Sequence, residues 1–414
     1  MKIKTLLAAV SALTLTACTA YVAWKSVIPG ANLTGPALPI ATDTVSNSYQ
    51  LFPVGTALHL RKLSPKGAEL WQVPVETTTT ESVASLLLRT TSTGAAVSYR
   101  DPVTQQAYLK HFDINGNLTW SSDFGEHASE TVIDVAVGSD GNLTVGVRLA
   151  GTRSDVLRYD SNGNLLWSTA IPACALTCQP ALAVDAAGQT LLSNSDLFAS
   201  KSYLLDSTGL ITWNRSRSTG ISIAGLVPNA VRATSTGFVI SHPLVTWFYD
   251  TTGTQIWSQS LGSRIPAVSD ASGNVFVATG TKISKLGPDG VTLLEIDLSS
   301  QSGIIQMGWR EDLQRLFVLT SYNTIGPEID ATITNESGTT LFAFDAAGAK
   351  KGSIKSTPTQ IKTPICVPGI DCTISISTIY GESWSSFVFT ADRKAIVSGI
   401  KPQSERFARA YKFL

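Results

Sequence analysis

The sequence has little charge. Asp, Glu, Lys and Arg make up 15% of its 414 residues, against roughly a quarter in an average soluble chain. The 31 basic residues balance the 31 acidic ones, so the chain carries no net charge. A general nucleic-acid-binding protein shows a basic excess or stripe, and this balance argues against nucleic acid as a partner. Histidine is also scarce: His59, His111, His127 and His242 leave little material for a His-rich metal centre.

The motifs of common catalytic sites are missing as well. The sequence contains no Gly-rich phosphate loop, no HExxH and no GxSxG. No other group of residues assembles a catalytic constellation. We therefore predict a protein that is not an enzyme, with no catalytic residues, no metal site and no cofactor. A hydrophobic content of 43% still allows a sizeable core.

The N-terminus has the pattern of an export signal. Lys2 and Lys4 precede an apolar run from Leu6 to Ala17, which is too short for most membrane spans and typical of a signal peptide. An alternative stays open, because residues 5–24 carry no charge and about 20 apolar residues can span a bilayer as an uncleaved anchor. In either case the rest of the chain is predicted to be exported.

The string Leu15-Thr16-Ala17-Cys18 resembles the lipobox of bacterial lipoproteins. The resemblance implies cleavage before Cys18 and a lipid on its thiol. It also implies transfer to the outer membrane, because Thr19 follows the cysteine in place of Asp. The expected location is the bacterial cell envelope, with the periplasmic side favoured over the cell surface. Residues 1–17 would be the signal peptide and residues 18–48, rich in Pro, Gly, Thr, Ser and Ala towards their end, a lipidated cysteine and flexible tether.

The remaining chain repeats one pattern: a strand, a tight turn, and a strand that ends in Trp. Asp or Asn opens such a turn by accepting hydrogen bonds from the backbone, and Gly supplies a positive φ. Gly follows Asp by three residues and Trp follows Gly by four. The best copies contain Asp113, Gly116 and Trp120; Asp160, Gly163 and Trp167; Asp206, Gly209 and Trp213; and Asp250, Gly253 and Trp257. We interpret these residues as structural, with Trp packing between neighbouring repeats.

A second series of hairpins alternates with the first, so each repeat supplies four strands. Repeats of about 40–50 residues with four short strands are the signature of a β-propeller. We predict an all-β protein, a propeller of four-stranded antiparallel blades over residues 49–414. Seven blades are favoured and eight are possible. The first outer hairpin, at Gly67, and the last inner hairpin, near Arg393, are expected to complete one blade together, joined by the strand Arg406–Leu414.

The Asp-x-x-Gly-x-x-x-Trp turns resemble those of the PQQ-like propeller superfamily, which includes outer-membrane assembly lipoproteins of the BamB type. The resemblance covers roughly residues 50–414. In quinoprotein enzymes of the superfamily, the turn is typically one residue longer between Asp and Gly, and a Thr precedes the Gly. This chain departs from that pattern. The resemblance therefore implies a propeller that acts as a scaffold, with outer-membrane assembly as its finer form, more than a quinone-dependent enzyme.

Long segments are predicted to gather on one face of the ring. The Asp/Gly turns share one face of a four-stranded propeller, and the other connections share the opposite face. The second set contains the long segments Glu76–Ser82, Ser168–Pro180, Arg215–Pro228, Ser321–Thr339 and Lys355–Glu382. Because long loops on a rigid scaffold are where function concentrates, we predict that this face and the mouth of the central channel bind an envelope protein or peptide.

Two cysteine pairs lie in these long segments. If Cys18 is lipidated, four cysteines remain, and an exported protein meets an oxidising compartment. We predict two local disulfides, Cys174–Cys178 and Cys366–Cys372. A four-thiolate zinc site and a crossed pairing are the alternatives, although the spacing lacks a CxxC knuckle. Calcium binding by the turn aspartates is a further alternative, less favoured than hydrogen bonding within their own turns.

Two other functions stay open at this stage. One is a propeller enzyme, such as a quinone-dependent dehydrogenase or a hydrolase. It would need acidic or basic residues converging at the ends of the inner strands. The other is a glycan-binding surface adhesin, which the low charge and the abundant Ser, Thr and aromatic residues allow. The favoured hypothesis is a non-catalytic envelope lipoprotein that acts as a protein-binding scaffold.

Overall fold

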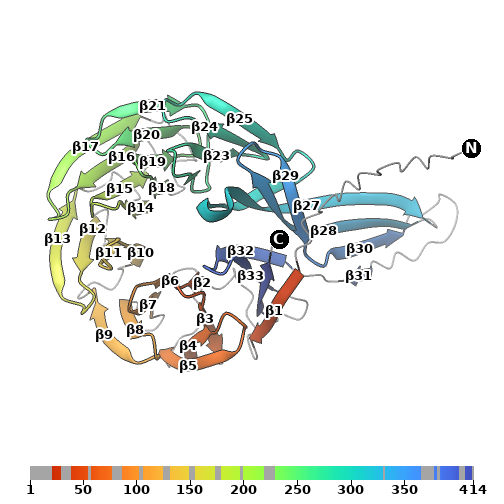
Figure 1. Cartoon of the computed structure of the whole chain (residues 1–414), viewed down its shortest axis with the longest axis horizontal. Coiled ribbons are helices and arrows are strands. Elements are labelled where there is room, and N and C mark those ends of the chain that lie inside the picture. The colour runs from red at the N-terminus through yellow and green to blue at the C-terminus, as the bar shows by residue number, and fades with distance from the viewer. Residues whose placement is uncertain are drawn as a thin grey trace, which may run out of the picture.

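The fold was derived from a computed structural model. It describes residues 21–28, 39–54, 57–76, 86–101, 106–124, 131–148, 154–172, 179–195, 199–218, 229–329, 332–364, 377–379, 383–400 and 406–412. The described strands form eight antiparallel sheets arranged as blades around a common centre (Figure 1). The all-β propeller predicted from the repeats is therefore confirmed, with eight blades, the alternative to the favoured seven. No helix in the described ranges is long and apolar enough to cross a membrane.

Blades one to six follow one another along the chain, and each runs from its innermost to its outermost strand. The first three blades contain β2 (Ile40–Thr42), β3 (Ser48–Val54), β4 (Ala57–Leu63) and β5 (Glu69–Glu76); β6 (Leu87–Thr90), β7 (Gly94–Arg100), β8 (Ala107–Asp113) and β9 (Leu118–Asp123); and β10 (Thr131–Val137), β11 (Leu143–Arg148), β12 (Ser154–Tyr159) and β13 (Leu165–Ile171). The next three contain β14 (Gln179–Val184), β15 (Thr190–Ser195), β16 (Ala199–Leu205) and β17 (Ile211–Ser218); β18 (Ala230–Ala233), β19 (Gly237–Ser241), β20 (Thr246–Asp250) and β21 (Gln255–Gln259); and β22 (Val268–Ser269), β23 (Val275–Thr279), β24 (Lys282–Leu286) and β25 (Thr292–Asp297).

Blades seven and eight depart from this pattern. Blade seven contains β26 (Gly303–Arg310), the short 3-10 helix η3 (Glu311–Leu313), β27 (Arg315–Ile329), β28 (Thr332–Asp345) and β29 (Lys350–Lys355), extended by β30 (Thr359–Pro364) and β31 (Ser377–Ile379). Blade eight contains β32 (Ser383–Phe389), β33 (Lys394–Ile400), β34 (Arg406–Lys412) and, as its outermost strand, β1 (Tyr21–Ile28). Both ends of the chain thus contribute to one blade, as predicted.

The partners in the closing blade differ from the expected ones. β1 pairs with β34, with Tyr21 opposite Lys412 and Ile28 opposite Arg406. The hairpin at Gly67 instead belongs to a complete first blade that begins with β2. The stretch 18–48, expected to be a tether, therefore contains β1 and β2. Its low charge and its Pro and Gly content suggested a linker, but residues 21–28 pair with β34 as a strand.

The seven-blade count was too low because the sequence analysis missed one inner turn that has no glycine. In the turn that joins β2 to β3, Ser46 takes the positive φ of 70°. Asp43 Oδ1 accepts the backbone N–H groups of Val45 (3.1 Å) and Asn47 (2.8 Å), as in the glycine-containing turns. Counting this turn gives eight inner turns against seven outer ones. In blade eight the third and fourth strands, β34 and β1, are far apart in the sequence, and Tyr21 pairs with Lys412 where the other blades have their outer turn.

The hydrophobic core lies between successive blades. The core between blades one and two joins Leu51 and Leu60 to Val97 and Tyr99, all at most 1% exposed. The last such layer, between blades eight and one, is smaller and combines Ile40 and Leu63 with Ile396, Ala408 and Ala410. A single blade has two apolar faces and cannot bury both alone, so only the closed ring buries all of them.

Candidate binding surfaces

The two faces of the ring differ in the length of their connections. The turns that join first to second and third to fourth strands share one face, which we call the turn face. The connections from second to third strands, and from one blade to the next, share the opposite face, which we call the loop face. Each of the long segments predicted from the sequence belongs to the loop face by this topology.

The turn aspartates are engaged by their own turns. Asp113 Oδ1 accepts the backbone N–H groups of Asn115 and Asn117, both at 2.8 Å, and Asp113 Oδ2 accepts from the Asn117 side chain (2.9 Å). The hydrogen bond from the Asn117 side chain lowers the pKa of Asp113. Asp160, Asp206 and Asp250 likewise accept backbone N–H groups in their turns. Among the described residues, no group of three or more His, Cys, Asp or Glu side chains is placed to hold a metal ion.

The repeat tryptophans pack against the glycine turn of the next blade. A methyl group on Gly163 would lie 2.5 Å from the ring of Trp120, and one on Gly209 would lie 2.6 Å from the ring of Trp167. Trp120 Nε1 donates to Ser161 O (3.2 Å), and Trp167 Nε1 donates to Ser207 O (2.9 Å). The same packing of ring against glycine joins Trp71 to Gly116, Trp213 to Gly253, and Trp257 to Gly290. These residues therefore join neighbouring blades.

All five cysteines lie outside the described residues. They are Cys18, Cys174, Cys178, Cys366 and Cys372. Lipidation, the two disulfides and their alternatives therefore stay predictions. His127 also lies outside the described ranges. His111 and His242 are buried. Burial lowers the pKa of both.

Blade seven carries a projecting sheet that we call the arm, formed by residues 322–329 of β27, residues 332–338 of β28, β30 and β31. The β27–β28 hairpin continues past the end of β26, whose pairing with β27 stops at Ser321. On the other side, β29 pairs with the inner part of β28, and β30 then takes over from Ser337 to Thr332. Figure 1 shows the arm standing out beyond the outline of the ring.

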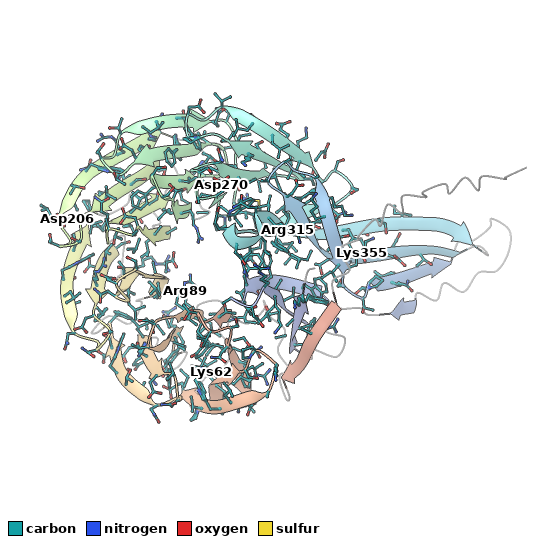
Figure 2. The ribbon with its side chains drawn as sticks, in the orientation of Figure 1. Lys62, Arg89, Asp206, Asp270, Arg315 and Lys355 are labelled. Carbon is teal, nitrogen blue, oxygen red and sulfur yellow. The ribbon has the colours of Figure 1, made fainter. Side chains whose placement is uncertain are left out.

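The base of the arm is held by specific contacts. Ser356 lies between β29 and β30, and its Oγ accepts the backbone N–H of Thr339 (3.0 Å). Thr339 Oγ1 accepts the backbone N–H of Trp384 in blade eight (3.2 Å). Lys355 lies over the ring of Tyr322 at 5.0 Å, at the base of the arm (Figure 2). Farther out, Ile325 is 77% exposed. The arm therefore combines an anchored base with an exposed apolar side chain farther out.

A cavity of about 810 Å³ occupies the centre of the ring. Its walls are the innermost strands β2, β6, β10, β14 and β18, together with Pro266 and Val388. A second cavity of about 420 Å³ shares Arg232, Pro266 and Val388 with the first. Most lining side chains are aliphatic, such as Leu88 and Val184. The centre of the ring is thus a channel lined mostly by aliphatic residues and large enough for a small molecule.

Three charged side chains line the larger cavity: Arg89, Asp134 and Arg232. Arg89 Nη2 donates to Asp134 Oδ1 (3.2 Å), and Arg89 Nε donates to Val135 O (2.9 Å). Asp134 Oδ2 accepts the backbone N–H of Leu182 from the next blade (3.3 Å). Burial raises the pKa of Asp134, and the charge of Arg89 partly offsets that effect. Arg89 lies at the inner edge of the ring (Figure 2).

Arg232 has a different environment. Its side chain is open to the channel, and within the described part of the chain it has no hydrogen-bond or ion-pair partner. Partial desolvation by the surrounding channel walls lowers the pKa of Arg232, and the neighbouring charge of Arg89 lowers it further. An arginine nevertheless stays protonated at neutral pH. The channel therefore contains a positive charge that no described residue compensates.

The sequence interpretation missed these three residues. The inner hairpins of the chain contain mostly Ser, Thr, Ala and Val, and this composition gave no indication that charged residues converge. A signal was present in the strings Arg89-Thr-Thr-Ser-Thr-Gly94 and Arg232-Ala-Thr-Ser-Thr-Gly237. The two strings share the turn sequence Thr-Ser-Thr-Gly, and in each an arginine lies two residues before the first residue of the turn. Only the closed ring brings Arg89 and Arg232, which are far apart in the chain, to one cavity.

Comparison with known proteins supports the fold alone. No protein-family model and no curated protein matches the chain. The structure is similar to that of Sqt1 from Chaetomium thermophilum, with a TM-score of 0.55 and 9% identity over 94% of this chain and 100% of that one. It is also similar to the Dos1 propeller, with a TM-score of 0.52 and 12% identity over 92% of each chain. At these identities the likeness shows a shared propeller architecture.

Proposed function

We propose that the protein is a non-catalytic lipoprotein of the bacterial envelope that binds a protein partner through its loop face and arm. The arm carries the proposal, because a ring needs no such extension for its own closure. The resemblance to BamB-type lipoproteins adds a finer form of the proposal, a role in outer-membrane assembly. The lipobox resemblance at Cys18 supports the envelope location.

The arm suits a partner segment in an extended conformation. Beyond Ser321, β27 pairs with β28 on one side only within the described residues. Its other side is a sheet edge, and an extended peptide can add to such an edge through backbone hydrogen bonds. Ile325 offers an exposed apolar side chain on this strand. We propose that the partner adds a strand here and that loops of the loop face provide further contacts.

The position of the chain start supports a defined orientation on the membrane. Tyr21 pairs with Lys412 at the end of β34, and β34 runs from the loop face to the turn face. β1 therefore begins at the turn face, and Cys18 precedes it by only three positions in the sequence. A lipid on Cys18 would hold the turn face towards the membrane and leave the loop face open. Exposed aliphatic side chains at the turn face, such as Leu118, Leu165 and Leu210, suit a position close to lipid.

The partner site is tested by site-specific photo-crosslinking in cells of a bacterial host that expresses the full chain. A photoreactive residue replaces Ile325 on the arm or Leu210 on the turn face, which are 77% and 66% exposed. We expect a discrete protein adduct from position 325 and none from position 210. A second experiment places the photoreactive residue at position 323 and combines it with Ile325→Lys. This lysine should remove the adduct, because a charge at a sheet edge opposes strand addition. Leu210→Lys should leave it unchanged.

Equal adducts from both positions, or an adduct that survives Ile325→Lys, would contradict the arm as the partner site.

Lipidation is tested separately by the mass of the N-terminal peptide and by fractionation of Cys18→Ser. We expect a diacylglycerol-modified peptide that starts at Cys18, and loss of membrane association in the variant. A chain that retains Met1 would support the uncleaved anchor instead.

A further inference from the structure

Arg89 and Arg232 occupy equivalent positions in blades two and five. Each lies two residues before a turn in which Thr N–H donates to Gly O, from Thr91 to Gly94 (2.9 Å) and from Thr234 to Gly237 (2.8 Å). Five other blades have an inner turn closed by a comparable backbone hydrogen bond. Their corresponding residues are small and aliphatic: Ala41, Ala136, Ala183, Val268 and Val388. The two arginines therefore depart from a pattern that otherwise keeps this level of the channel apolar.

The charges at this level do not cancel. Two arginines and one aspartate line the larger cavity, which leaves one positive charge. Asp134 is engaged by Arg89 and by two backbone N–H groups, of Val135 (2.9 Å) and Leu182 (3.3 Å). Arg232 keeps its donors free within the described residues. A guanidinium presents a planar fork of N–H donors that matches a carboxylate.

We propose that the central channel binds an organic monoanion, a carboxylate on an aliphatic body, with Arg232 holding the carboxylate. The aliphatic walls from β2, β10 and β14 would contact the body of the ligand. The volume of about 810 Å³ lies within the range of small-molecule sites. This inference goes beyond the proposed partner binding, because the site lies inside the ring and depends on neither the arm nor the lipid.

Octanoate is the probe that tests the site. It is titrated by calorimetry at low salt into the protein starting at residue 21, and 1-octanol serves as a neutral probe of similar length. We expect octanoate to bind, and 1-octanol to bind at least about tenfold more weakly because it cannot pair with a guanidinium. Arg232→Met should weaken octanoate binding at least about tenfold. Arg215→Met, a matched change at an exposed arginine of the outer strand β17, should leave it unchanged.

A thermal melt separates lost binding from lost folding. Arg232→Met removes an uncompensated charge, so the variant should melt at the same temperature as the unmodified protein or higher. The absence of octanoate binding, equal affinity for octanoate and 1-octanol, or equal octanoate affinity of Arg232→Met and the unmodified protein would overturn the proposal. Ile325→Lys should bind octanoate normally, so failure of the arm proposal and failure of the channel proposal are distinguishable.

Discussion

At the scale of the residue, the turn glycines meet two separate requirements. Gly163 has a φ of +84°, which side-chain-bearing residues adopt at a cost. It also faces the Trp120 ring so closely that a methyl group would lie 2.5 Å from it. Gly273 has a similar φ of +79°, but a methyl group there would have its nearest neighbour at 3.5 Å. A substitution at Gly273 therefore introduces backbone strain alone, whereas the same substitution at Gly163 introduces strain and crowding between blades.

We predict that Gly163→Ala lowers the free energy of unfolding by about 2–4 kcal/mol, from about 1–2 kcal/mol of backbone strain and the rest from overpacking. Gly273→Ala should cost only the strain, about 1–2 kcal/mol. Urea denaturation followed by tryptophan fluorescence measures both. Equal losses in the two variants would show that the contact with Trp120 does not limit this position.

At the scale of the element, side chains tie each blade to the next. Arg158 of β12 is buried, and its Nη1 donates to Gly188 O in blade four (2.7 Å). Its Nη2 donates to Asp140 Oδ2 in its own blade (2.6 Å). The pair Lys351 and Asp345 of blade seven (2.8 Å) is more exposed, with the lysine side chain 43% accessible. The Arg158 contacts therefore join two blades in a buried position, whereas the pair of Lys351 and Asp345 lies at the surface of one blade.

Arg158→Met should lower the free energy of unfolding by about 2–3 kcal/mol, because it leaves Gly188 O without its charged donor. Lys351→Met should change it by about 0.5 kcal/mol or less, as exposed ion pairs contribute little. Chemical denaturation of both variants under the same conditions provides the comparison. Similar effects in the two would contradict the role of Arg158 as a tie between blades three and four.

The arm is an element that the sequence predicted only in part. Ser321–Thr339 and Lys355–Glu382 were expected to be long loops on one face, and the topology assigns their described parts to the loop face. In the structure much of the first and part of the second are strands, paired through β28 and β30. These strands were missed because the segments lack the repeated turn and the steady alternation of apolar and polar residues that marked the other strands.

At the scale of the whole molecule, the ring closes through a strand from the start of the chain. β1 covers the edge of β34 from Tyr21 opposite Lys412 to Ile28 opposite Arg406. Without β1, blade eight would have three strands and an open edge. An unpaired edge of this kind favours both unfolding of the blade and association with other chains. The closing layer beneath it is small, which adds to the importance of this strand.

A protein starting at residue 29 should therefore melt at least about 5 °C below one starting at residue 21, a difference that corresponds to roughly 4 kcal/mol for a chain of this size. It should also be cleaved faster by protease within blade eight. Differential scanning calorimetry and limited proteolysis test both expectations. Equal melting temperatures would mean that β1 contributes nothing to closure.

The sequence by itself determined the type of blade, because an Asp or Asn, a positive-φ residue and alternating apolar residues specify a hairpin locally. It also determined which connections are short and which are long, and hence the difference between the two faces. The number of blades depended on one turn at Asp43 and Ser46 that lacks the glycine signal. Only the tertiary structure decided how β1 closes the ring and how Arg89, Asp134 and Arg232 meet in one channel. Those contacts join residues far apart in the chain, and local sequence patterns carry no information about which distant edges and charges come together.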